Sequence, residues 1–301
     1  FSANGGTTVT APALYVQGAC DMNGASVDFN VPPTPPPPGC LPSTCRVDEA
    51  ASFVGDPLSL VRPPDPTDLT IQQCGSGPPS TALSPKTCTL NGTVVLEPGT
   101  YYGGWKISST GADVTLKPGI YVIAGGGIND TGGILTSAAG QVLIFSTDAS
   151  ADWKAQCIAG TGTAAACQNA LSMAGGTTLN LTGLDRVSDC PPYSTNGCPF
   201  GGLLMWQDGK GSAVVLGGNR CDIKLGGSGS LYLSGTIYAK CGLVTISGTS
   251  SASGCDTLAS TQNCAAVQII SDTWDVGGSA ILLMPYDPNA FYKLNLKGLV
   301  K

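Results

Sequence analysis

The amino-acid sequence predicts an all-β protein: a parallel, right-handed β-helix (β-solenoid) with N-terminal strands, a proline-rich connector and disulfide-stapled loops. Composition is the first reason. The chain has 42 glycines and 22 prolines, only 11% charged residues, and glutamate only at Glu49 and Glu97. Because Glu, Lys and Arg normally fill the exposed faces of helices, this chain has little material for surface helices.

An internal repeat is the second reason. The segment VLEPGTY at residues 95–101 is echoed by TLKPGIY at residues 115–121, which aligns Leu96 with Leu116 and Tyr101 with Tyr121. Each copy contains a short β run, a Pro-Gly turn of the type that needs a positive φ at glycine, and a second β run. A strand, a corner and a strand in about twenty residues are what one coil of a β-solenoid requires.

The third reason is a series of strand-sized runs bounded mostly by Gly, Ser, Asn or Asp. In the run 230–238, Leu231, Leu233 and Ile237 share one parity and polar or tyrosine side chains the other, which predicts one apolar and one wettable face. The runs lie at residues 141–147, 177–182, 202–206, 213–216, 222–225, 230–238, 243–247, 265–271 and 279–284.

A β-sandwich or a jelly roll is the alternative architecture, since both are rich in short strands. Such folds join strands mainly by hairpins, which favour Asn-Gly or Asp-Gly turns. Those dipeptides, such as the ones at residues 91–92, 196–197 and 208–209, are few beside the Gly-Gly and Pro-Gly corners. The sequence therefore favours the β-helix.

Four segments follow along the chain. Residues 1–30 are predicted to form N-terminal strands, residues 31–90 a proline-rich connector and covering loop with disulfides, residues 91–286 the β-helix, and residues 287–301 a C-terminal strand or tail. Six prolines between residues 31 and 39 favour a stiff polyproline II segment. Prolines continue through residues 50–73, which we interpret as a loop that covers the β-helix.

Thirteen cysteines, with no CxxC pair and no histidine, favour disulfides over zinc sites and predict an oxidising, extracellular or cell-surface location. Sequence cannot fix the connectivity. Spacing suggests five local pairs: Cys74 with Cys88, Cys157 with Cys167, Cys190 with Cys198, Cys221 with Cys241, and Cys255 with Cys264. These pairs leave Cys20, Cys40 and Cys45, which cannot all pair with one another. One of the three is a free thiol, is bonded to another chain or pairs with a cysteine outside these residues.

Charge and hydropathy exclude two classes of partner. The net charge is -6 and the 14 Lys and Arg residues are dispersed, so we expect no nucleic-acid binding. No window approaches 18 uninterrupted apolar residues, so we expect no transmembrane segment in this chain. No secretory signal is recognisable, and the sequence leaves open whether a leader or anchor preceded Phe1.

Six phrases follow one another along the chain: NGGTTVTAPALYV at 4–16, DPL at 56–58, LEPGTYYGG at 96–104, LKPGIYVIAGGG at 116–127, GGLLMWQD at 201–208 and LSGTIYA at 233–239. Their order resembles the extracytoplasmic part of TadG-like proteins of Flp (tight-adherence) pilus systems. The resemblance implies a β-helical form that follows a membrane-anchoring helix and acts in pilus assembly or surface attachment. This chain departs from the family in lacking the anchor, in its many cysteines and in its polyproline segment.

Many parallel β-helices cleave or modify polysaccharides, so a polysaccharide-active enzyme is a further, less favoured functional class. The chain has no histidine for a catalytic triad, and its Arg186 and Arg220 stand in separate contexts. The closest late acidic pairs are Asp148 with Asp152 near Trp153 and Lys154, Asp185 with Asp189, and Asp272 with Asp275 around Trp274. We interpret the first and third pairs as turn residues beside packed tryptophans, and we expect no enzyme, no catalytic residue, no metal and no cofactor.

A glycan-binding adhesin module is the second functional class, with Trp105, Trp153 and Trp274 as surface aromatics that would contact sugars. Three asparagines, Asn91, Asn129 and Asn180, match the N-glycosylation pattern and are candidate acceptor sites.

The ends of a β-helix carry unpaired backbone donors and acceptors. In the tail, Tyr292, Leu294 and Leu296 alternate with polar residues, as in a strand that caps its own coil or joins a neighbouring subunit. The segment Thr7 to Tyr15 is the other candidate assembly strand. We therefore expect a non-enzymatic structural protein of a cell-surface filament or pilus-associated assembly that contributes to adhesion or surface architecture. Its partners would be other copies, joined head-to-tail or by strand exchange, or other pilus or surface components.

Overall fold

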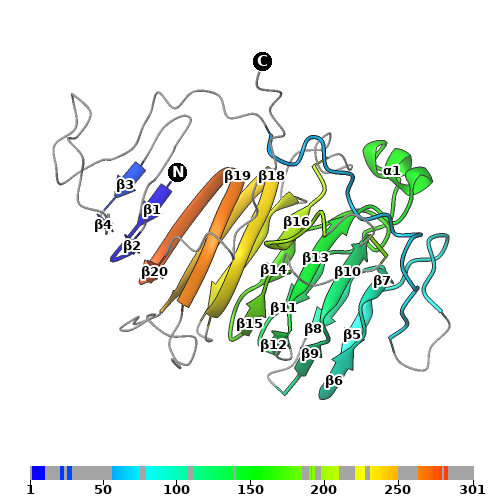
Figure 1. The fold of residues 1–301 in the computed structure, drawn as a ribbon, viewed down its shortest axis with the longest axis horizontal. Coiled ribbons are helices and arrows are strands. Elements are labelled where there is room, and N and C mark those ends of the chain that lie inside the picture. The colour runs from blue at the N-terminus through cyan, green and yellow to red at the C-terminus, as the bar shows by residue number, and fades with distance from the viewer. Residues whose placement is uncertain are drawn as a thin grey trace.

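The computed structural model describes most of the chain between residues 2 and 283 (Figure 1). The described residues are 2–10, 21–23, 26–28, 56–74, 79–107, 111–137, 140–184, 190, 192–193, 198–209, 221–227, 231–249, 264–279 and 281–283.

The described strands stack into a parallel β-helix with three faces (Figure 1). They form a 17-stranded sheet and a three-stranded sheet, and every strand pairing described between them is parallel. The all-β, parallel β-helix predicted from the sequence is confirmed, and the hairpin-linked sandwich is not the fold.

Each face is a column of strands stacked along the axis. The first face contains β7 (Gly99–Tyr102), β10 (Gly119–Ala124), β13 (Val142–Thr147), β16 (Leu203–Gln207) and the middle parts of β18 (Leu231–Thr249) and β19 (Cys264–Ser279).

The second face begins one corner further along each coil. It contains β5 (Cys88–Leu90), β8 (Trp105–Ile107), β11 (Ile128–Asp130), β14 (Leu171–Met173), β17 (Ile223–Gly227), the last parts of β18 and β19, and then β1 (Ser2–Asn4) and β3 (Asp21–Asn23).

The third face completes the triangle. It contains β6 (Thr93–Leu96), β9 (Asp113–Leu116), β12 (Ile134–Ser137), β15 (Thr178–Thr182) and the first parts of β18 and β19, followed by β20 (Ile281–Leu283), β2 (Thr8–Thr10) and β4 (Ser26–Asp28).

The repeat seen in the sequence occupies two successive coils. Leu96 lies opposite Leu116, and Gly99 and Gly119 have φ values of 150° and 140°, as the Pro-Gly turns require. After the turn the register changes, because Gly99 lies opposite Tyr121 and not Gly119. A Cβ on Gly119 would come within 2.6 Å of the Pro98 Cβ, so the turn of one coil packs against the strand start of the next. The twenty-residue spacing therefore holds on the third face and lengthens on the first.

Apolar side chains from all three faces fill the interior. Its large, fully buried members include Trp105, Tyr121, Ile144 and Leu135. Because successive coils stack with strands in register, their apolar interior side chains form columns along the axis. Burial of these side chains holds the coils together in addition to the backbone hydrogen bonds.

A second apolar cluster lies on the outer side of the first face. It includes Phe145, Phe200 and Trp206, and residues 56–74, called here the strap, contribute Leu58, with Val61 and Leu69 packed against it. The interpretation of this part of the chain as a covering loop agrees with that position. The predicted wettable parity of residues 230–238 is wrong at Thr236 and Tyr238, which are 0% and 3% exposed under this cover.

One helix interrupts the strands. α1 (Ala151–Ile158) lies in the insertion between β13 and β14, and the Ser150 hydroxyl accepts a hydrogen bond from the Trp153 backbone N–H at 3.3 Å. Serine is a favourable N-cap because its side chain satisfies a free amide of the first turn. No helix among the described residues is long and apolar enough to cross a membrane.

Four disulfides tie loops to the coils: Cys74–Cys88, Cys157–Cys167, Cys190–Cys198 and Cys221–Cys241, with Cα separations of 5.3 to 5.7 Å. These are four of the five local pairs that the spacing suggested. Cys20, Cys40, Cys45, Cys255 and the Cys264 side chain lie outside the described residues. Disulfides of this number are typical of an oxidising compartment.

Candidate functional site at the ends of the β-helix

The N-terminal strands extend the β-helix beyond its C-terminal strands (Figure 1). On the second face Ser2 lies opposite both Asp275 of β19 and Asp21 of β3. On the third face Thr8 lies opposite both Ile281 of β20 and Ser26 of β4. The strands β1 to β4 are called here the N-terminal coil. They form two successive rungs that continue the ladder beyond β19 and β20.

Side chains of the N-terminal coil fit this position closely. Ala3 and Val9 are fully buried, and Val9 belongs to the interior cluster. The Asn4 side-chain amide donates to the Asp275 carboxylate at 3.4 Å, and the Thr7 hydroxyl contacts the Gly278 carbonyl oxygen at 3.2 Å. Gly5 has a φ of 73°, a left-handed conformation that glycine adopts without strain.

At the opposite end the ladder finishes with β5 and β6, called here the first coil. β5 pairs with β8 and β6 pairs with β9, and no other strand among the described residues pairs with either. Val95 of β6 is 55% exposed at this end. An edge strand of this kind is a template for pairing with another chain.

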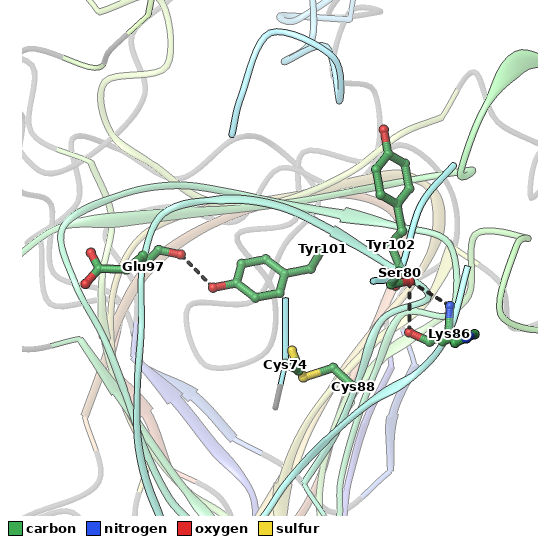
Figure 2. Close-up of a disulfide and its surroundings, with 7 residues drawn as sticks. All are labelled: Cys74, Ser80, Lys86, Cys88, Glu97, Tyr101 and Tyr102. Carbon is green, nitrogen blue, oxygen red and sulfur yellow. Dashed lines mark hydrogen bonds between the residues drawn. A yellow bond between two sulfur atoms is a disulfide. The ribbon is translucent and has the colours of Figure 1, made fainter. Parts of the chain in front are cut away.

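The interior of the first coil is closed by a disulfide and an aromatic cluster. Cys74 joins Cys88 inside the coil, Tyr101 lies beside this disulfide, and Tyr102 points away from the interior (Figure 2). The Tyr101 ring meets Trp105 edge-on at 5.0 Å and stacks with Tyr121 at 6.1 Å. This end is therefore a packed surface with exposed β edges and not an open cavity.

The two repeat tyrosines bind back across their own turns. The Tyr101 hydroxyl donates to the Glu97 carbonyl oxygen at 2.7 Å (Figure 2), and the Tyr121 hydroxyl donates to the Lys117 carbonyl oxygen at 2.7 Å. Burial, with the nearby Glu97 charge, raises the pKa of Tyr101, and burial is also the main cause of the raised pKa of Tyr121. Both tyrosines are neutral hydrogen-bond donors that lock the corners of successive coils.

The structure describes two of the three candidate carboxylate pairs, and in each of these the two side chains have different surroundings. The Asp148 side chain is buried and accepts from the Gln168 backbone N–H at 2.7 Å, whereas Asp152 is exposed in the first turn of α1. Asp272 is exposed, and Asp275 is engaged by Asn4. Within the described residues no three His, Cys, Asp or Glu side chains gather as metal ligands. Residues 185, 186, 189 and 220 lie outside the described part of the chain.

Of the three predicted surface aromatics, one is buried and two are half-buried. Trp105 is 1% exposed inside the β-helix, so its assignment as a sugar-contacting residue is wrong; in β8 it is the neighbouring Lys106 that faces outward. Trp153 is half-buried, and its indole N–H donates to the Ala82 carbonyl oxygen at 2.7 Å. Trp274 is half-buried against the interior cluster.

The three candidate glycosylation residues are accessible. Asn91 is exposed in the turn between β5 and β6, Asn129 on the outer side of β11, and Asn180 on the outer side of β15. The tail residues Tyr292, Leu294 and Leu296 lie outside the described part of the chain, as does the second half of the segment Thr7 to Tyr15.

A buried amide pair escaped sequence analysis. The Gln168 side-chain amide donates to the Gln207 side-chain oxygen at 2.7 Å, and Gln207 in turn donates to the backbone carbonyls of Asn169 and Asp222 at 3.3 and 3.2 Å. These residues lie far apart in the sequence and belong to no recognisable motif. Their bonds satisfy buried polar groups at a corner between coils, which is a structural role.

No family model, no curated protein and no solved structure matches this chain.

Proposed function

We propose that this protein is a non-enzymatic structural subunit of an extracellular, cell-surface assembly, and that it self-associates through the ends of its β-helix. The observation that supports this most directly is the edge of the first coil, where Val95 is exposed and no other described strand pairs with β6. The resemblance of the sequence to TadG-like proteins supports a pilus-associated setting and a contribution to adhesion or surface architecture.

The two ends of the ladder are complementary in direction. The N-terminal coil ends at β3 and β4, the first coil begins at β5 and β6, and all of these strands run in the same parallel sense within the ladder. A second copy stacked on the first along the axis would therefore continue the ladder with parallel pairing on the second and third faces; on the first face, residues 70–72 of the strap already pair with the edge of β7. Such a head-to-tail contact does not close on itself and produces a filament.

The candidate sites for chemistry and sugar binding support the same proposal. Trp105 packs inside the β-helix, Asp148 binds a backbone amide, and Asp275 binds Asn4. Each of these side chains is used to hold the fold. A glycan-binding adhesin remains the alternative, and the half-buried Trp153 and Trp274 are the aromatics that could serve it.

A charge placed on the exposed edge tests the proposal. Lysine on an edge strand disfavours pairing with another chain, so Val95→Lys should prevent assembly without disturbing the fold. Ile134→Lys is the matched control, because Ile134 is 38% exposed on the same face in the middle of the ladder. Light scattering after gel filtration and negative-stain electron microscopy measure the outcome.

We expect the wild type and Ile134→Lys to form elongated assemblies at high protein concentration and Val95→Lys to remain monomeric. A wild type that stays monomeric throughout the concentration range, or a Val95→Lys protein that assembles as well as the control, contradicts the proposal.

A further inference from the structure

The N-terminal coil is joined to the rest of the protein by a connector that is longer than its position requires. Strand β4 ends at Asp28, and the next described residue, Asp56, is held on the outer side of the first face by Tyr238 at 2.6 Å and by Lys240 at 2.9 Å. On the third face, β4 is four steps along the ladder from the coil that contains Tyr238, through β2, β20 and β19. Four steps at ~4.8 Å each correspond to about 19 Å along the axis.

The 27 residues between Asp28 and Asp56 can span far more than this. At the ~3.1 Å per residue of polyproline II, 27 residues reach about 80 Å. If the N-terminal coil instead lay between two stacked copies, with β4 next to β6 of its own first coil, Asp28 would be five steps from the coil of Tyr238, or about 24 Å along the axis. The connector is long enough for both positions.

The contacts of the N-terminal coil are the same in both positions. It pairs with β19 and β20 through parallel backbone bonds, through Asn4 and Asp275, and by inserting Val9 into the interior. Any copy of the chain presents this same surface. Exchange of an identical element between copies therefore loses no contact, which makes it a low-cost route to association.

We infer that the N-terminal coil is exchanged between copies: strands β1 to β4 of one chain pack on β19 and β20 of the next. The inference rests on the proposed function, and it names the element that links neighbouring subunits. In such an assembly the donated coil lies between the receiving end of one copy and the first coil of its own chain, and the parallel ladder is continuous on the second and third faces.

The cysteine count is consistent with a covalent link near this junction. Eight of the thirteen cysteines form the four described disulfides. The remaining five are Cys20, Cys40, Cys45, Cys255 and Cys264, an odd number that cannot pair completely within this chain. Cys20 directly precedes β3 of the N-terminal coil, and Cys264 begins β19 of the receiving end.

A cross-linking experiment between two full-length variants tests the exchange. Ser2 and Asp275 are register partners and are half-buried on the outer side of the second face, next to the fully buried Ala3 and Val276. Adjacent residues in a ladder lie within the Cα range of a disulfide. Ser2→Cys protein is mixed with Asp275→Cys protein under assembly conditions, with oxidised glutathione as oxidant, and the products are resolved by non-reducing electrophoresis and peptide mass spectrometry.

Exchange predicts a covalent dimer of twice the 30.3 kDa chain mass, linked through residues 2 and 275, whose yield rises with protein concentration. Mixing Ser2→Cys with Asp272→Cys is the matched control, because Asp272 is exposed on the same strand but out of register. The double variant Ser2→Cys with Asp275→Cys reports the cross-link within one chain.

Cross-linking only within the double variant, or no 2–275 link in any sample, overturns the inference. Filaments seen by microscopy without a link in the mixed sample would show that copies stack without exchange, so the proposed function would stand alone. A link in the mixed sample together with full assembly of Val95→Lys would show exchange without stacking through the first coil.

Discussion

Asn4 and Asp275 come from opposite ends of the chain, yet the Asn4 side-chain amide lies 3.4 Å from the Asp275 carboxylate oxygen and donates a hydrogen bond to it. This contact belongs to the seam where the N-terminal coil joins β19. The last turns of the β-helix are therefore made by the start of the chain, and their attachment can be tested separately from the rest of the fold.

Val9→Asp should detach the N-terminal coil. Val9 is fully buried in the interior, and an unpaired carboxylate there should cost about 3 to 5 kcal/mol. Hydrogen exchange should show loss of amide protection in residues 273–276, with β10 unaffected. Gly6→Asp is the control, because Gly6 is exposed and a Cβ there meets nothing within 4 Å. Equal loss of protection in β10 would show that the coil does not separate from the rest of the protein.

Gly126→Ala should destabilise the whole β-helix. Gly126 has a φ of 71°, and a Cβ there would lie 2.0 Å from the Gly103 carbonyl oxygen of the preceding coil. The left-handed conformation alone should cost about 1 to 2 kcal/mol, and the backbone clash adds to it. Gly111→Ala, at an exposed glycine with open space, should be nearly neutral in urea denaturation. Similar midpoints for the two variants would contradict the close packing of the Gly-Gly corners.

Tyr121→Phe should lower the free energy of unfolding by about 1 to 2 kcal/mol, because it leaves a buried carbonyl without its donor. The Tyr121 hydroxyl bonds the Lys117 and Leu96 carbonyl oxygens at 2.7 and 2.8 Å. Tyr232→Phe provides the comparison, since Tyr232 lies on the outer side of the third face opposite the exposed Asn180. A larger decrease in the free energy of unfolding for Tyr232→Phe than for Tyr121→Phe would indicate that the Tyr121 hydrogen bond across the turn contributes little to stability.

The contact between the strap and Tyr238 should weaken in acid. Burial opposes ionisation of Asp56, but hydrogen bonds from Tyr238, Lys240 and the Leu58 backbone outweigh it and lower its pKa below the ordinary value of 3.8. A lowered folded-state pKa stabilises the protein above the ordinary value, and this contribution is lost as pH falls through the folded-state pKa. The difference in Tm between wild type and Asp56→Asn should therefore shrink below about pH 4. A difference that is constant from pH 7 to pH 2 would contradict this assignment.

Replacing both Cys74 and Cys88 with alanine should cost about 3 kcal/mol, the value expected for a loop of about 15 residues. The two cysteines are 14 residues apart and close the interior of the first coil (Figure 2). The same replacement at Cys157 and Cys167 should mainly increase hydrogen exchange in α1, because that disulfide ties an insertion outside the strands. The prediction is wrong if replacing Cys157 and Cys167 lowers the global free energy of unfolding and replacing Cys74 and Cys88 does not.

Short-range features of this protein were predictable from sequence. The Pro-Gly turns at Gly99 and Gly119 need only local backbone geometry, and the disulfide pairs seen in the structure join cysteines that are near neighbours along the chain. The scarcity of helix-forming residues gave the fold class, although the short helix α1 was missed. Its signal was Ser150, a favourable N-cap before Ala151.

The inward-facing and outward-facing residues of a strand were predictable only where the rest of the protein covers a single side of that strand. Tyr238 and Thr236 have the parity of solvent-facing residues, but the strap and its neighbours bury the outer side of the first face. Trp105 occupies an inward position in a three-residue strand, too short for alternation to decide its direction.

Sequence by itself determined the all-β class and the turns that separate strands, because these depend on composition and on residues within a few positions of one another. Tertiary structure alone decided which strand stacks on which: it placed Ser2 beside Asp275, shifted the register between Gly99 and Tyr121, and laid the strap over the first face. A strand edge can form parallel backbone bonds with many other strands. The packing of the whole interior therefore selects the pairing partners, and no local sequence pattern predicts them.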